Sequence, residues 1–209
     1  LNRAILFSVF LVRIRERLRV WDWSKQARSD VHFSAVELFG RALPDDPKGT
    51  YRLTGKWSFR LDPGQEGVKS EWFKQSVFGD GWSQVSVPGR QEEYDVAGVA
   101  GYDGWSWFAR TFEAPASWKG HVVHLKFEAV DDEAEVWVNG ERVGEHRKEG
   151  ENDPNWWEEP FEFDITKVLR WDGSNTVVVL VTDFRLDGGM TKPVFLRWAD
   201  GPGMLAPER

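Results

Sequence analysis

Apolar and polar residues alternate over short stretches of the chain from about residue 53 onward. In the segments "GKWSFRLD" (55–62) and "HVVHLKFEAV" (121–130), apolar side chains occupy every second position and so lie on one face. A period of two is typical of a β-strand with one buried face. The segment "NTVVVLVTDF" (175–184) is almost uniformly apolar and β-branched, which predicts a central strand that is covered on both faces.

The sharpest turn signal is Asn139-Gly140, which joins two strand-like runs in "EAEVWVNGERVGEH" (133–146). This pair supplies the positive φ angles of a type I′ turn and predicts a β-hairpin. Further turn signals separate the strand candidates at short intervals, and we identify no internal repeat. The pattern predicts an all-β fold, an antiparallel sandwich or jelly roll.

The strand pattern is absent from the first part of the chain. We expect residues 1–47 to form a leader and linker, helical or disordered, followed by one β domain over 48–200 and a tail over 201–209. The apolar run "AILFSVFLV" (4–12) is too short for a membrane span. If residues 1–29 act as an export signal, the protein is periplasmic or extracellular; otherwise it is cytoplasmic.

Composition changes this picture in two ways. Residues 31–209 carry 31 acidic against 20 basic side chains, so the main body should repel nucleic acid. The chain has 13 Trp and no Cys. The absence of Cys excludes disulfides and thiolate metal sites. A core of this size does not usually contain so many Trp residues, so their number requires a separate explanation.

The order of motifs resembles a known family. The segments "LTGKWSFRLDPG", "YDGWSWFARTF", "VWVNGERVGEH", "PFEFDITKVL" and "GGMTKPVFL" are similar to the N-terminal sugar-binding domain of glycoside hydrolase family 2, the β-galactosidase, β-glucuronidase and β-mannosidase group. The resemblance covers about residues 53–197 and implies a galactose-binding-like jelly roll. It also implies that an immunoglobulin-like domain and a catalytic TIM barrel follow in such enzymes.

Three functions stay open from the sequence. The chain is expected to be a carbohydrate-binding module whose partner is an oligosaccharide or glycan. Alternatively, it is part of a glycosidase that is active only with a catalytic barrel from the same gene or a partner chain. The third possibility is a jelly roll that binds other proteins. We identify no catalytic carboxylate pair, because the neighbouring acids at 92–93, 131–133 and 158–159 lack the fixed separation that glycoside hydrolysis needs.

The main candidate ligand site lies in "NDPNWWEEPFEFD" (152–164), where the sequence departs from the family pattern. Trp156 and Trp157 offer flat indoles for the apolar face of a pyranose, and Asp153 and Asn155 can bind its hydroxyls. The alternatives are that the indoles plug the end of the sandwich or pack against a neighbouring domain.

A second candidate element is the turn before the strand at 105–112. The resemblance implies that Tyr102, Asp103 and Trp105 approach the sugar, and that Asp164 matches a family aspartate. Asp164 can equally cap the amides of the following turn.

We expect no cofactor and no metal site. The one exception that composition leaves open is a structural calcium ion in "EGENDPN" (149–155), a loop rich in hard oxygen donors.

Overall fold

The computed structural model describes residues 20–22, 27–29, 49–148 and 155–199. The chain contains two compact units, Leu1–Leu43 and Pro44–Arg209, which we describe separately. In the first unit, β1 (Val20–Asp22) pairs antiparallel with β2 (Ala27–Ser29). These six positions are extended, and the other residues of the expected leader lie outside the described residues.

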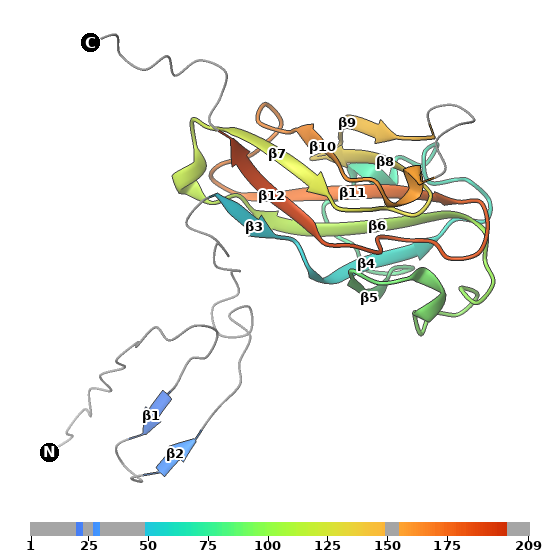
Figure 1. The fold of residues 1–209 in the computed structure, drawn as a ribbon, viewed down its shortest axis with the longest axis horizontal. Helices are drawn as coiled ribbons and strands as arrows, with labels where there is room; N and C mark the ends of the chain where they lie inside the picture. The colour runs from blue at the N-terminus through green and yellow to red at the C-terminus, as the bar shows by residue number, and fades with distance from the viewer. Residues whose placement is uncertain (1–19, 23–26, 30–48, 149–154, 200–209) are drawn as a thin grey trace, which may run out of the picture. The chain divides into compact units, whose positions relative to one another are not determined.

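The second unit contains two antiparallel sheets (Figure 1). The smaller sheet has four strands in the order β10-β7-β12-β3. Their bounds are β3 Thr50–Arg52, β7 Val122–Phe127, β10 Phe161–Asp164 and β12 Val194–Ala199.

The larger sheet has six strands in the order β5-β4-β6-β11-β8-β9. Their bounds are β4 Gly55–Leu61, β5 Ser83–Val87, β6 Gly104–Glu113, β8 Glu133–Val138, β9 Glu141–His146 and β11 Ser174–Asp183. β11 pairs with both β6 and β8, which confirms the prediction of a central strand from its uniformly apolar sequence. Four short 3₁₀ helices connect the strands: η1 Trp72–Lys74, η2 Gln91–Glu93, η3 Ala116–Trp118 and η4 Trp156–Glu158. This is the expected all-β jelly-roll sandwich.

The main core lies between the two sheets. Trp57, Phe59 and Phe108 of the larger sheet are fully buried, as are Leu125 and Phe127 of the smaller one. Phe59 packs edge-on against Phe108, with ring centroids 4.9 Å apart. The alternation at 55–61 and 122–127 therefore correctly predicted which side chains face inward.

The hairpin at Asn139-Gly140 also forms as predicted. Asn139 has φ 53° and Gly140 φ 86°, the backbone conformation that this turn requires. The Asn139 side chain donates to the Val168 carbonyl at 2.7 Å and accepts from the Thr176 amide at 3.0 Å. These bonds tie the turn to the connection between β10 and β11.

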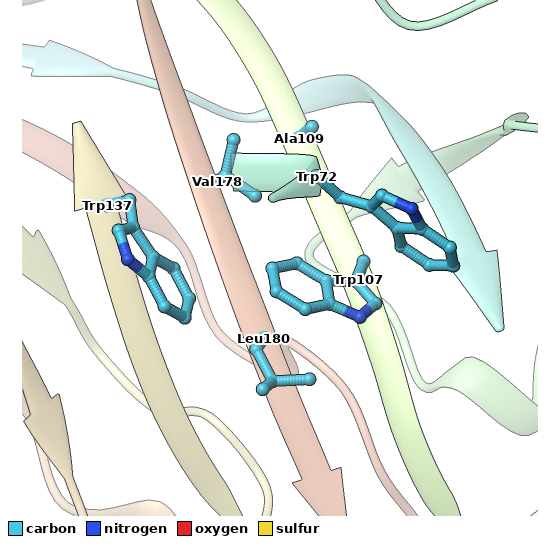
Figure 2. Close-up of a cluster of buried hydrophobic side chains, with 6 residues drawn as sticks. All are labelled: Trp72, Trp107, Ala109, Trp137, Val178 and Leu180. Atoms are coloured by element: carbon cyan, nitrogen blue, oxygen red, sulfur yellow. The ribbon is translucent and has the colours of Figure 1, made fainter. Parts of the chain in front are cut away.

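The outer face of the larger sheet carries a second apolar layer, which explains much of the Trp content. Trp107, Ala109, Trp137, Val178 and Leu180 come from β6, β8 and β11, and Trp72 of η1 packs onto them (Figure 2). The Trp107 ring stacks on Trp137 with centroids 5.5 Å apart and meets Trp72 edge-on at 5.8 Å. We call these six residues the aromatic layer.

One edge of the sandwich closes where β9 of the larger sheet meets β10 of the smaller sheet. A Cβ atom at Gly144 would lie 2.3 Å from the Phe163 ring, so only a glycine leaves room for that ring. Phe163 in turn lies beside Phe161, with centroids 5.5 Å apart. The missing side chain at Gly144 thus allows the edges of two different sheets to come into contact.

Among the described residues, no helix is long and apolar enough to cross a membrane.

Candidate functional site

A large open depression of about 1430 Å³ lies at one end of the sandwich. Its wall comes from the loops that follow β5 and β11, the start of β8, Lys148 and η4. The loop from β11 to β12 lies at the right-hand end of the sandwich in Figure 1, whereas β12 ends at the left. The residues used below are Asp131, Asp132, Glu133, Trp156, Trp157, Phe184, Arg185 and Leu186. We call this the end depression.

The two neighbouring indoles of the end depression differ in exposure. Trp156 is 7% exposed, and its carbonyl oxygen lies 2.9 Å from Nε2 of His146. Its ring packs at a tilt against Phe184, with centroids 6.5 Å apart. Trp157 is 37% exposed, although both belong to η4. Trp156 therefore anchors the short helix, and Trp157 is the indole that a ligand can reach.

A buried carboxyl group lies directly behind the depression. Asp183 is 2% exposed and accepts hydrogen bonds from Nε2 of Gln91 at 2.7 Å and from the Arg185 amide at 2.9 Å. Burial raises its pKa to about 7; the hydrogen bond from Arg185 opposes this shift, and the negative charge of Glu92 adds to it. Its charge state therefore changes near neutral pH.

A second carboxyl group with the same property lines the depression itself. Burial and the neighbouring Asp132 raise the pKa of Asp131 to about 7. The Asp131 backbone is held by two hydrogen bonds to Gly189, of 2.9 and 2.8 Å. Asp132 accepts a hydrogen bond from the Phe184 amide at 2.8 Å. These contacts fix the start of β8 against the loop after β11.

Ion pairs occupy the rim of the end depression. Arg90 lies 2.9 Å from Asp187, and Lys192 lies 3.6 Å from Glu158. The depression thus combines an accessible indole with carboxyl groups that accept hydrogen bonds and, when protonated, also donate them. This mixture suits a ligand with an apolar face and several hydroxyl groups.

The structure distributes the predicted ligand residues over several places. Trp156 and Trp157 line the end depression. The Tyr102 hydroxyl donates to the Trp105 carbonyl at 2.9 Å, and the Tyr102 carbonyl accepts from Gln91. Asp103 is exposed, and its charge contributes to the raised pKa of Asp183. Trp105 lies on the outer face of the larger sheet, partly buried against the aromatic layer.

Asp164 and Asn155 do not line the end depression either, and neither do Tyr102, Asp103 and Trp105. Asp164 accepts hydrogen bonds from the amide and the hydroxyl of Thr166, at 2.9 and 2.6 Å, and these bonds lower its pKa. This is the capping role that the sequence left open as the alternative. Asn155 directly precedes η4, and its carbonyl accepts from the Glu158 amide at 3.0 Å. Asp153 lies outside the described residues.

The part of the chain that the structure describes contains no group of three or more His, Cys, Asp or Glu side chains able to hold a metal ion. Most of the calcium candidate at 149–155 falls outside that part, with Asn155 as its one described member.

Sequence reasoning missed Asp131, Asp183 and Gln91. Asp183 ends the apolar run of β11, but an acid at a strand end is more often exposed, so its burial could not be predicted from this position. Gln91 gave no signal either. It is fully buried in a short loop helix, and its Oε1 has no hydrogen-bond partner.

The antiparallel sandwich with a recess formed by its end loops defines a jelly-roll domain. The family model for the sugar-binding domain of glycosyl hydrolases family 2 matches residues 50–202. The chain belongs to this family, as its motif order implied.

Relatives with curated descriptions support the same assignment. A β-glucuronidase from Paenibacillus borealis is 31% identical over 63% of this chain, and one from Sus scrofa is 30% identical over 63%. A β-galactosidase from Thermoanaerobacter pseudethanolicus is 38% identical over 38% of this chain. The chain spans only 20% of the length of the first of these relatives.

Solved structures confirm the fold. A β-glucuronidase from an uncultured Clostridium species superposes with a TM-score of 0.63 at 22% identity, over 76% of this chain and 30% of the other. A Lactobacillus rhamnosus β-glucuronidase gives 0.62 at 24% identity, over 75% and 30%.

Proposed function

We propose that this domain binds carbohydrate in the end depression, with Trp157 as the stacking surface. The observation that carries the proposal is an indole 37% exposed on the wall of a depression that Asp131 and Asp132 also line. An indole face suits the C–H face of a sugar ring, and the carboxyl groups suit its hydroxyls. The names of the relatives favour β-glucuronides and β-galactosides as the sugar class.

The test compares binding of the wild type, Trp157→Ala and Val77→Ala on a glycan array and by calorimetry. Val77 is 79% exposed and does not line the end depression, so it is a matched control for removing an exposed apolar side chain. We expect Trp157→Ala to weaken binding about tenfold or more, because aromatic anchors dominate the energy of such sites. Equal binding by all three proteins would contradict the proposal.

A second function is favoured by the coverage of the relatives and by the exposed apolar side chains at the rim. The chain spans about a fifth of the curated β-glucuronidases, and Phe184 and Leu186 are 55% and 80% exposed. We propose that the depression can also face a catalytic domain, from the same gene or a partner chain, so that the sugar is held between them. If the domain binds a protein partner but no glycan, the third possibility, a jelly roll that binds other proteins, is favoured.

The two functions separate in one experiment. If a catalytic domain completes the site, the purified 209-residue chain should show no hydrolysis of nitrophenyl β-glucuronide, and adding a family 2 catalytic region in trans should restore turnover. If the chain binds glycan but the added catalytic region restores no turnover, the carbohydrate-binding module is favoured.

A further inference from the structure

A smaller depression of about 270 Å³ lies on the outer face of the larger sheet. Its floor is a row across three strands, because Thr182 of β11 is in register with Trp105 of β6 and with Glu133 of β8. Glu135, Arg147 and Leu180 complete it together with Ala134 and Phe184. We call this the side depression.

The side depression adjoins the end depression. Glu133 and Phe184 line both of them. Phe184 is 55% exposed, and its ring lies beside that of Trp156. The shared boundary is thus one exposed aromatic ring and one carboxylate. A chain of sugar rings can therefore pass over Phe184 with one ring in each depression.

The chemistry of the side depression matches that of the end depression. The partly buried Trp105 offers an indole, and Thr182 adds a hydroxyl that both donates and accepts hydrogen bonds. Nη1 of Arg147 lies 3.5 Å from Glu133 and its Nη2 lies 3.9 Å from Glu135, while its Nε lies 2.6 Å from Glu145. Arg142 pairs with both Glu135 and Glu145, so the five charged groups hold one another in place. An indole beside hydrogen-bond donors and acceptors in fixed positions suits a pyranose ring.

The charge of the side depression selects among sugars. Its lining contains Glu133, Glu135 and Arg147. Together with Arg142 and Glu145, which pair with these residues, the cluster has three carboxylates against two cations and a net charge of about −1. Glu133 and Glu135 are only 17% and 21% exposed, so water screens them less than surface groups. A uronate ring would meet net negative charge here, whereas a neutral ring would not.

We propose that the side depression is a second sugar subsite, so that the domain binds a neutral β-linked oligosaccharide across both depressions rather than a single ring. The proposal rests on carbohydrate binding in the end depression and adds the length and the charge class of the ligand.

The test uses calorimetry with methyl β-galactoside as a single ring and β-1,4-galactotetraose as a chain. We expect the wild type to bind the tetrasaccharide about tenfold or more tightly than the single ring. Thr182→Lys fills the side depression from a partly exposed strand position and leaves the indole packing of Trp105 in place. It should lower tetrasaccharide affinity about five- to tenfold and leave single-ring binding unchanged.

Two further variants complete the design. Trp105→Ala should have the same selective effect on the tetrasaccharide, and circular dichroism shows whether its loss of packing has altered the fold. Val77→Lys adds the same charge outside both depressions and should behave like the wild type. Trp157→Ala should weaken both ligands.

The outcomes distinguish the two proposals. A wild type that binds no glycan on an array overturns carbohydrate binding itself and the second subsite with it. Array binding without binding of the tetrasaccharide, equal affinities for the two probes, or an unchanged ratio in Thr182→Lys overturns the second subsite alone.

Discussion

Asp62 and Asp183 are two aspartates with the same exposure, 2%, in opposite surroundings. Asp62 lies beneath the aromatic layer and accepts three hydrogen bonds, from the Glu66 and Gly67 amides and from Nε1 of Trp107, at 2.8 to 2.9 Å. Asp183 lies behind the end depression and accepts two, while burial and, to a smaller extent, the charges of Glu92, Asp103 and Asp132 raise its pKa.

The difference shows how one fold uses buried acids in two ways. At Asp62 the donors come from a tight loop and from a Trp of the sheet, so the carboxylate fastens the connection after β4 to the aromatic layer. At Asp183 the neighbouring acids outnumber the hydrogen-bond donors, so the energetic cost of burying the carboxylate is not fully compensated. The first region contributes to stability, and the second keeps protonatable groups next to the end depression.

The strongest test of the stabilising region is Trp107→Ala. Trp107 is fully buried, stacks on Trp137 and donates to Asp62, so its removal leaves a cavity and takes away one of the two donors to Oδ2 of Asp62. We expect the free energy of unfolding to fall by about 3–5 kcal/mol. Urea titration measures this fall, and the exposed Leu186→Ala variant is the control. A loss below about 1 kcal/mol would show that the outer layer is not a second core.

The raised pKa of Asp183 should make the stability of the folded chain depend on pH. The pKa of Asp183 is about 7 in the folded chain, above its ordinary value of 3.8. The folded chain therefore binds more protons than the unfolded chain between these values. The resulting stability is complete below about pH 4 and is lost as pH rises through 7. Asp131 acts in the same direction.

We accordingly expect stability to fall by about 2 kcal/mol between pH 5 and pH 8. Asp183→Asn should make this profile less steep, because an amide does not ionise, and the contribution of Asp131 should remain. Asp172→Asn, at an exposed turn position, should leave it unchanged. Urea titrations at several pH values measure the slope, and a wild type that gains stability over this range would contradict the assignment.

The smallest effect is expected for Trp157→Ala. Its side chain is 37% exposed, so its removal leaves no closed cavity, and the free energy of unfolding should change within about 0.5 kcal/mol. Thermal unfolding measures this change. A loss of several kcal/mol would make Trp157 part of the packing and weaken its role as a ligand surface.

The fold could be predicted from sequence because its main signals are local. The alternation in β4 and β7, the apolar run in β11 and the Asn139-Gly140 turn each follow from side-chain period or backbone conformation alone. The same alternation put Trp105 and Trp107 on one face of β6. It did not reveal that Trp72 of a distant loop covers that face.

The site was predicted less completely because it depends on contacts between remote segments. Trp156 and Trp157 are sequence neighbours and could not be told apart until η4 turned one inward. Gln91 and Asp183 are 92 positions apart, and only the folded chain brings them together. For Asp164, the local capping geometry was foreseen as an alternative, since its partner is two residues away.

Gly144 and Phe163 show how this architecture constrains its own evolution. Because the aromatic ring occupies the space of a missing side chain, any replacement at position 144 collides with it while residue 163 stays large. A lineage can acquire a side chain at 144 only after position 163 has become smaller, and the reverse order passes through a protein whose two sheets are forced apart. The closure of this edge of the sandwich thus depends on both positions together, and neither can change in size independently of the other.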